Sequence, residues 1–212
     1  MTEGVHDAYT PHAPVRDQGK RPTCVAFAVA AAHELVSVSP DYYSVEFAFW
    51  AAKARDGGID AARGTLISAG LRGALEEGSR SEVLWPYGVS PWPPGPAPAV
   101  AVAGARTGSA FSYAHVALSF DAIASALSSG PIILGYLIVP QSWKAPRGVV
   151  DVVAGRKPSG RHAVVALAHD DHKDALVVRN SWGERWGDRG YGYVTRAYTD
   201  LFLLSAFEVT RC

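Results

Sequence analysis

Four side chains in this sequence could together carry out nucleophilic chemistry: Gln18, Cys24, His162 and Asn180. A cysteine thiolate is a strong nucleophile, and an imidazole can take up its proton and later return it. An amide beside the histidine can fix the orientation and tautomer of the ring. A second amide, six residues before Cys24, could join the backbone N–H of Cys24 in stabilising an oxyanion. Together the four residues would form an activated nucleophile, its proton donor and a site for an oxyanion.

Cys24 begins an alanine-rich run, residues 24–36, that is apolar almost all round. This pattern predicts a helix in the interior of a domain. Thr23 is the expected N-cap, so Cys24 would lie in the first turn, where the helix dipole favours a thiolate.

His162 and Asn180 lie nine residues to either side of Asp171, which stands in the polar turn of a candidate hairpin. A symmetric hairpin would place them directly opposite each other, with Cβ atoms about 5 Å apart on one face of the sheet. A slip of one residue in register would separate them. The hairpin therefore predicts a histidine that is oriented by an amide.

The remaining elements fall into a helical half and a strand half. Helices are expected at about residues 44–55, 65–77 and 120–128. Strands are expected at about residues 132–139, 162–169, 175–180, 191–197 and 203–209. A proline-dense segment, residues 85–100, indicates the crossover between the halves. Helices followed by strands indicate an α+β fold in two lobes.

Composition excludes several classes of function. The 212 residues carry 20 basic and 20 acidic side chains, and this balance argues against nucleic-acid or anionic-membrane partners. No apolar run reaches the roughly 20 residues that span a bilayer, and no secretory signal is visible. With only two cysteines, no disulfide scaffold is expected, and a reducing, cytoplasmic location is predicted.

On spacing alone, a cysteine among alanines is more often a small buried side chain than a nucleophile. A histidine at a strand end is likewise more often structural. The residues around the candidates favour catalysis, since three blocks together resemble the papain-like cysteine peptidases. These blocks are Gln18-Gly19-x-x-x-x-Cys24-x-Ala26-Phe27-Ala28, His162-Ala163-Val164 and Asn180-Ser181-Trp182-Gly183-x-x-Trp186-Gly187-x-x-Gly190-Tyr191. His162 and Asn180 follow Cys24 by 138 and 156 residues, near the roughly 130–150 residues typical of that family.

The resemblance implies a papain-like two-lobe fold, in which residues 1–212 form one catalytic domain. Residues from about 15 to 100 would form the mainly helical lobe, with its central helix. Residues from about 101 to 212 would form an antiparallel, barrel-like β lobe, and the N-terminal arm would cross over to it. The active site would lie in the cleft between the lobes.

The resemblance also implies a role for each catalytic candidate. Cys24 would be the nucleophile, and His162 its base and acid. Asn180 would orient His162, and Gln18 would donate to the oxyanion.

Three further residues are implied to bind substrate or to shield the site. Gly64 would bind the substrate backbone. Ala163 would lie near the pocket for the second residue upstream of the cut. Trp182 would cover the His162–Asn180 hydrogen bond and keep water from it.

The sequence departs from the family pattern just before the nucleophile. Arg21 replaces a disulfide cysteine, in keeping with a reducing compartment. Pro22 replaces a glycine that lines the first substrate pocket, so that this pocket is expected to be reshaped. Val25 replaces the usual tryptophan. The resemblance is to a compact, bacterial-type member, and Gln18 lies so near the start that no inhibitory pro-segment is expected. Activity would then need another restraint, such as a regulatory protein partner.

Three functions remain open at this point. The first is hydrolysis of a peptide bond in a peptide or protein substrate through a Cys24 acyl-enzyme. The second is capture of that acyl-enzyme by an amine, which would make a peptide-tailoring enzyme. The third is an inactive peptide-binding homologue, and the intact Gln18, Cys24, His162 and Asn180 set argues against it. No metal or cofactor is expected, because the histidines and aspartates of residues 169–172 are predicted to form a solvated turn.

Overall fold

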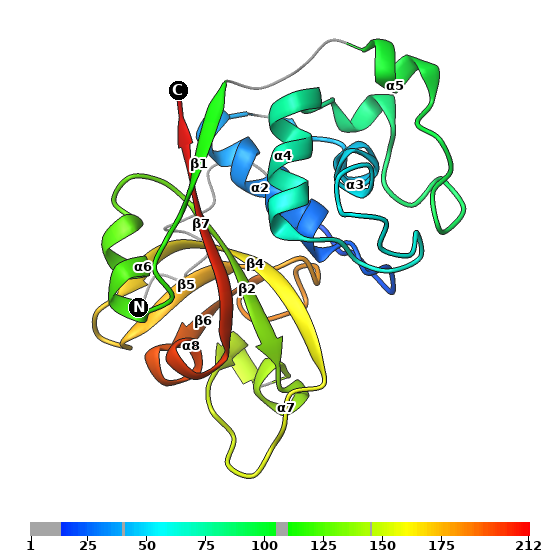
Figure 1. Cartoon of the computed structure of the whole chain (residues 1–212). Coiled ribbons are helices and arrows are strands. Elements are labelled where there is room, and N and C mark those ends of the chain that lie inside the picture. Colours follow the sequence, from blue (N-terminus) through cyan, green and yellow to red (C-terminus); the bar gives the residue numbers. More distant parts are fainter. Residues whose placement is uncertain (1–13, 40, 105–109, 145) are drawn as a thin grey trace. The chain divides into compact units, whose positions relative to one another are not determined.

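The computed structural model describes residues 14–39, 41–104, 110–144 and 146–212, and these residues form two units (Figure 1). The helical unit comprises Gln18–Ser112 and Arg211–Cys212. The sheet unit comprises Tyr113–Thr210 and the described residues up to Asp17. None of the described helices is both long enough and apolar enough to cross a membrane.

Three helices build the core of the helical unit: α2 (Cys24–Ser37), α3 (Val45–Lys53) and α4 (Ile67–Glu77). Every side chain of α2 from Val25 to Glu34 is buried, which confirms the predicted interior helix. Helices α3 and α4 approach closely at Gly73, where a Cβ atom would lie 2.9 Å from the carbonyl carbon of Ala51. A short helix α5 (Ala99–Ala103) and the turn η1 (Glu82–Leu84) complete the unit.

The start of α2 differs from the prediction in its capping. Thr23 occupies the N-cap position, but its side chain makes no capping hydrogen bond. Its hydroxyl instead lies 2.8 Å from the hydroxyl of Tyr87, which comes from the proline-dense segment. Ser44, by contrast, caps α3 by accepting from the backbone N–H of Phe47. The prediction that Cys24 lies in the first turn of α2 is confirmed.

Within the part of the chain that the structure describes, seven strands form one sheet in the order β1-β7-β2-β4-β5-β6-β3. The sheet is open, with β1 and β3 at its edges. The pairs β2–β7, β2–β4, β4–β5 and β5–β6 are antiparallel, and β3–β6 is parallel. The strands are β1 (Phe111–His115), β2 (Ile132–Ile138), β3 (Val149–Val150), β4 (Gly160–Asp170), β5 (Ala175–Arg179), β6 (Tyr191–Thr195) and β7 (Leu203–Arg211).

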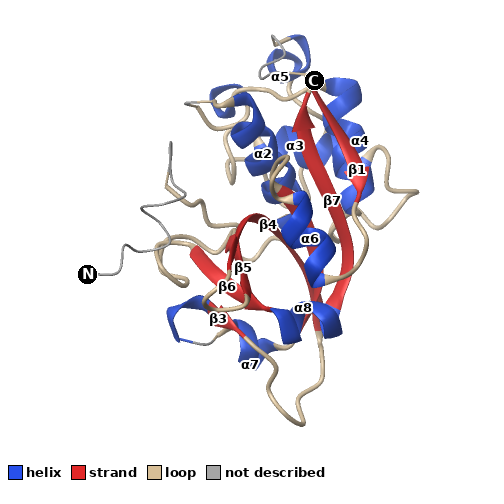
Figure 2. Ribbon diagram, turned by 90° about the vertical axis from the view of Figure 1, so that its left-hand side faces the viewer, coloured by secondary structure: helices blue, strands red, loops and turns tan. Residues whose placement is uncertain are grey.

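The core of the sheet unit lies between the central strands and two helices, α6 (Phe120–Ala126) and α8 (Arg196–Phe202) (Figure 2). Phe120 and Tyr198 bring these helices into the same buried cluster as Leu134 of β2 and Val164 of β4. Strand β2 is buried along Ile132–Tyr136, as expected of a continuous apolar run in the interior of a sheet. A further short helix, α7 (Pro140–Trp143), and the turn η2 (Pro146–Gly148) follow β2.

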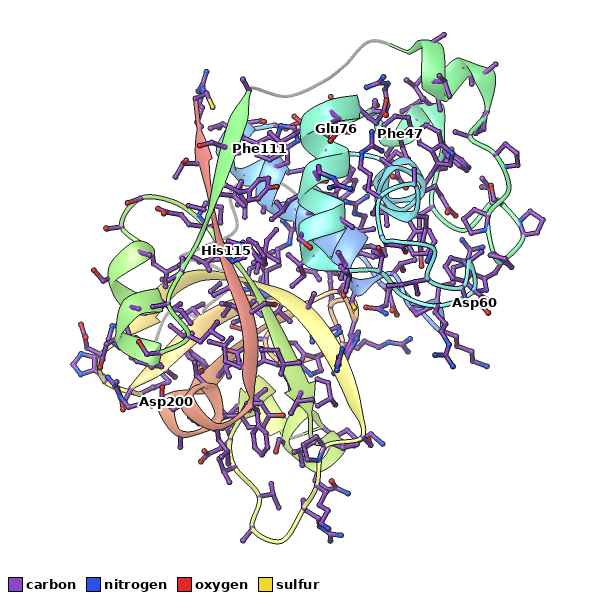
Figure 3. All side chains as sticks on the ribbon, in the orientation of Figure 1. Phe47, Asp60, Glu76, Phe111, His115 and Asp200 are labelled. Carbon is purple, nitrogen blue, oxygen red and sulfur yellow. The ribbon has the colours of Figure 1, made fainter. Side chains whose placement is uncertain are left out.

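Strand β1 was not predicted from the sequence. Its two ends are labelled in Figure 3 and carry Phe111 and His115. The His115 ring lies 4.3 Å from the ring of Phe207 on β7, and the Phe111 ring lies 4.4 Å from that of His33. The strand is therefore fixed by ring packing against residues far away in the sequence.

Candidate active site

His162 on β4 and Asn180, just after β5, are joined by a hydrogen bond. His162 Nε2 lies 2.7 Å from Asn180 Oδ1, and the two residues are only 6% and 5% exposed. The predicted pairing of the imidazole with an amide is therefore present.

The register that produces this pairing differs from the symmetric hairpin. Strand β4 pairs with β5 through Val165 opposite Arg179, and the register shifts after Ala166. Continued past the end of β5, this register would place Asn180 opposite residue 164 rather than 162. His162 itself pairs with Tyr136 of β2. The expectation that His162 and Asn180 lie directly opposite each other was thus wrong. An offset of two residues still keeps both side chains on the same face of the sheet, where diagonal neighbours can touch.

The tautomer of His162 follows from its neighbours. The backbone N–H of Ser181 donates to Asn180 Oδ1 over 2.7 Å, so the atom that faces His162 is the amide oxygen. An amide oxygen can only accept, and Nε2 must therefore carry a hydrogen. In the neutral ring, Nδ1 is then left with a lone pair that can take up a proton.

Two tryptophan rings enclose the imidazole. Trp182 stacks on His162 with centroids 4.6 Å apart, and the ring of Trp143 meets it edge-on at 5.4 Å. Trp143 is held in turn by a hydrogen bond of 2.9 Å from its Nε1 to the hydroxyl of Tyr198. The place of Trp182 over His162 agrees with the shielding role that the resemblance implies. The contact of Trp143 was missed, because an isolated tryptophan gives no sequence signal for its partner.

Burial dominates the ionisation of His162. It lowers the pKa of the ring from 6.5 to about 4, although the hydrogen bond to Asn180 acts to raise it. Without a nearby negative charge, the His162 ring is therefore neutral at about pH 7.

The helical unit contains the other two catalytic candidates. Cys24 is the first residue of α2 and is half-buried, while Gln18 lies in the loop before the helix. Gln18 Nε2 donates to the carbonyl oxygen of Arg21 over 2.8 Å. This bond ties the side-chain amide to the backbone just before α2.

The candidate substrate-binding residues are divided between the units. Gly64 lies beside Pro22 in the helical unit, where a Cβ atom would stand 3.2 Å from the Pro22 carbonyl oxygen. Ala163 and Trp182 belong to the sheet unit. Ala163 is 2% exposed and pairs with Gly135 of β2, whereas Trp182 is half-buried.

The N-terminal arm is fixed beside Trp182. Asp17 pairs with Trp182 in an isolated β-bridge, and the backbone N–H of Gly183 donates to the carbonyl of Arg16 over 3.2 Å. Val15 fills the space over Gly190, where any Cβ atom would collide with it. The residue that precedes Gln18 is thus bound to the residue that stacks on His162.

A sequence model of the papain family cysteine proteases matches residues 100–206. This match covers half of the chain and contains His162 and Asn180, but it does not reach Gln18 or Cys24.

Two curated relatives are similar over parts of the chain. An uncharacterized peptidase C1-like protein of Acanthamoeba polyphaga mimivirus is 25% identical over 193 residues, or 82% of this chain and 62% of that protein. The cathepsin B-like protein CP2 of Giardia intestinalis is 34% identical over 95 residues, or 43% of this chain and 31% of that protein. The chain therefore spans less than two thirds of the length of either relative.

Solved structures show the same fold. Xylellain, a cysteine protease from Xylella fastidiosa, has a TM-score of 0.80 at 23% identity, over 96% of this chain and 84% of that one. The Carica candamarcensis cysteine protease CMS1MS2, solved in complex with E-64, has a TM-score of 0.74 at 20% identity, over 94% of this chain and 93% of that one. These likenesses confirm the predicted α+β fold.

Proposed function

The chain belongs to the papain family of cysteine proteases, and from this membership we propose that it is a thiol-dependent hydrolase of peptide bonds in peptides or proteins. The observation that carries the proposal is the 2.7 Å hydrogen bond between His162 Nε2 and Asn180 Oδ1. It leaves Nδ1 as the proton acceptor that a thiol nucleophile needs.

In the proposed reaction, the thiol proton of Cys24 passes to His162 Nδ1, and the thiolate attacks the carbonyl carbon of the peptide bond. The oxygen of the tetrahedral intermediate accepts from an N–H of the Gln18 amide and from the backbone N–H of Cys24. As the C–N bond breaks, Nδ1 returns its proton to the leaving amine, and the acyl group remains on Cys24 as a thioester. Water then loses a proton to Nδ1, attacks the thioester and releases the carboxylic acid and the thiolate.

Asn180 has a defined part in this cycle. It keeps the Nε2 hydrogen in place, so that Nδ1 alone exchanges protons with the reactants. The rings of Trp182 and Trp143 exclude water around the imidazole, which strengthens this hydrogen bond.

The proposed thiolate and imidazolium depend on each other. Burial holds the pKa of His162 low, so the imidazolium needs a negative charge, which the Cys24 thiolate would supply. The imidazolium and the start of α2 in turn favour the thiolate. We expect the two groups to titrate as a coupled pair.

Alkylation by iodoacetamide tests the pair directly. Because only a thiolate reacts quickly, Cys24 of the wild-type protein is expected to react rapidly even at about pH 6, well below the ordinary thiol pKa of about 8.5. A His162→Ala variant should lose most of this reaction at low pH. Both proteins should carry Cys212→Ser, so that the adduct mass reports Cys24 alone. Equal rates in the two proteins would rule out the ion pair.

A second prediction concerns His162 once the thiol is removed. In a Cys24→Ala variant, His162 should titrate near the value of about 4 that its burial sets. Between that pH and the ordinary value of about 6.5, the unfolded chain binds a proton that the folded chain does not. Stability is therefore greatest above that window and decreases as the pH falls through it, by roughly 3 kcal/mol in total.

The measurement is the free energy of unfolding as a function of pH, with NMR titration of the imidazole as the direct readout. The matched control is Cys24→Ala with His162→Gln, which has no imidazole at this site. Its free energy of unfolding should lack the pH dependence that His162 contributes. An imidazole that titrates at its ordinary value in Cys24→Ala would contradict the prediction.

A further inference from the structure

Arg21, three residues before Cys24, has its guanidinium group enclosed within the helical unit. Its Nη1 lies 2.5 Å from Glu46 Oε1, and its Nη2 donates to the carbonyl oxygen of Ser90 over 2.5 Å. The Glu46 side chain is completely buried, and that of Arg21 is 17% exposed. The two charges are therefore paired largely away from water. There, the hydrogen-bond geometry decides whether the ion pair offsets the free-energy cost of removing both charges from water.

The partners of Arg21 are themselves connected. Glu46, in the first turn of α3, also accepts from the backbone N–H of Gly88 over 3.0 Å. The guanidinium carbon lies 5.2 Å from the ring centroid of Tyr87 and 5.5 Å from that of Trp92. The proline-dense segment and α3 thus both bind the Arg21 guanidinium. In the family pattern, the position of Arg21 is that of a disulfide cysteine.

The backbone of Arg21 controls the Gln18 side chain. Gln18 Nε2 donates to the Arg21 carbonyl oxygen, and the carbonyl of Gln18 accepts from the Tyr87 hydroxyl over 2.9 Å. Since the amide nitrogen donates to Arg21, a shift of that carbonyl would turn the Gln18 amide with it.

We propose that Arg21 is a positioning residue, and that its ion pair with Glu46 fixes the loop of residues 18–23 so that the Gln18 amide is directed at the oxyanion. The inference rests on the proposed function, in which Gln18 stabilises that charge. The planar fork of arginine reaches Glu46 and the Ser90 carbonyl at the same time. A lysine could retain the charge but not both bonds in this geometry.

Two variants test the proposal. Removing Arg21 alone would leave the Glu46 carboxylate buried and unpaired, so the first variant is the neutral pair Arg21→Met with Glu46→Gln. The second is Arg21→Lys, which keeps the charge and tests the fork. Arg55→Met is the matched control, because Arg55 also pairs with glutamates of its own unit, Glu76 (labelled in Figure 3) and Glu77.

Both test variants should lower kcat for peptide hydrolysis by at least about tenfold, and by no more than the roughly 10²–10³-fold expected when the oxyanion donor itself is removed. KM should change little, and the alkylation of Cys24 should keep the wild-type rate, because alkylation forms no oxyanion. The Arg55→Met control should leave kcat unchanged.

The decisive measurement repeats these substitutions in a Gln18→Ala background. If Arg21 acts through Gln18, they should cause no further loss of kcat there. An equal loss in both backgrounds, or wild-type kcat in either test variant, would overturn the inference. If the double variant Arg21→Met with Glu46→Gln does not fold, the loss of kcat is compared in the two backgrounds with Arg21→Lys alone. Failure of the proposed function differs, since the wild-type protein would then hydrolyse no peptide substrate. Failure of the Gln18 role alone would leave kcat normal in Gln18→Ala.

Discussion

A Cys24→Ala variant is expected to lose peptide hydrolysis almost completely, with kcat lower by about 10⁶, the scale seen when a hydrolase loses its nucleophile. The thiol forms the acyl-enzyme in the proposed mechanism, and alanine offers no group that could replace it. The change removes one half-buried sulfur atom from the start of α2, so the Tm near neutral pH should remain close to that of the wild type. Turnover of a peptide substrate and thermal unfolding measure the two effects.

Cys212→Ser is the matched control for this experiment. Cys212 is exposed and is the only other cysteine in the sequence. It should change neither kcat nor the Tm. The experiment matters because the family match begins at residue 100, so the role of Cys24 rests on its motif and on its place at the start of α2. Normal turnover by Cys24→Ala would refute the assignment.

Gln18→Ala is expected to lower kcat by about 10²–10³ while KM changes little. The amide is proposed to bind a charge that exists only in the transition state, so the loss should appear in the chemical step. The rate at which iodoacetamide labels Cys24 should stay close to that of the wild type. Steady-state kinetics and labelling rates on the same samples measure both quantities.

Asn180→Ala provides the contrasting variant. Asn180 holds His162 rather than the oxyanion, so its loss should weaken both turnover and the alkylation of Cys24 at about pH 6. If Gln18→Ala slowed alkylation as much as Asn180→Ala, the two amides would not have the separate roles proposed for them.

The sequence predicted the His162–Asn180 contact, although it predicted the wrong register. A two-residue error in register leaves both side chains on the same face of a sheet, so the contact survived the error. The offset arises because the turn is centred between His172 and Lys173 rather than on Asp171, and the irregularity after Ala166 reduces it from three residues to two. Neither the turn centre nor the irregularity gives a signal in the sequence.

Contacts between distant segments were beyond prediction for a related reason. Thr23 is a good N-cap by residue type, yet its hydroxyl pairs with Tyr87, which is 64 residues away. Arg21 was recognised as a departure from the family pattern, but nothing nearby in the sequence indicates its pairing with Glu46. Local patterns give helices and strands, whereas the choice between competing partners depends on which segments the fold brings together.

The position of β7 determines when this sheet can be completed during synthesis. Among the described strands it is the last in chain order, yet it lies between β1 and β2. A growing chain can already form the β4–β5 hairpin next to His162, but β2 then has an unpaired edge until β7 emerges from the ribosome. Unpaired edges of this kind invite association with other chains. A nascent molecule therefore depends on β7 to cover this edge and so to avoid aggregation.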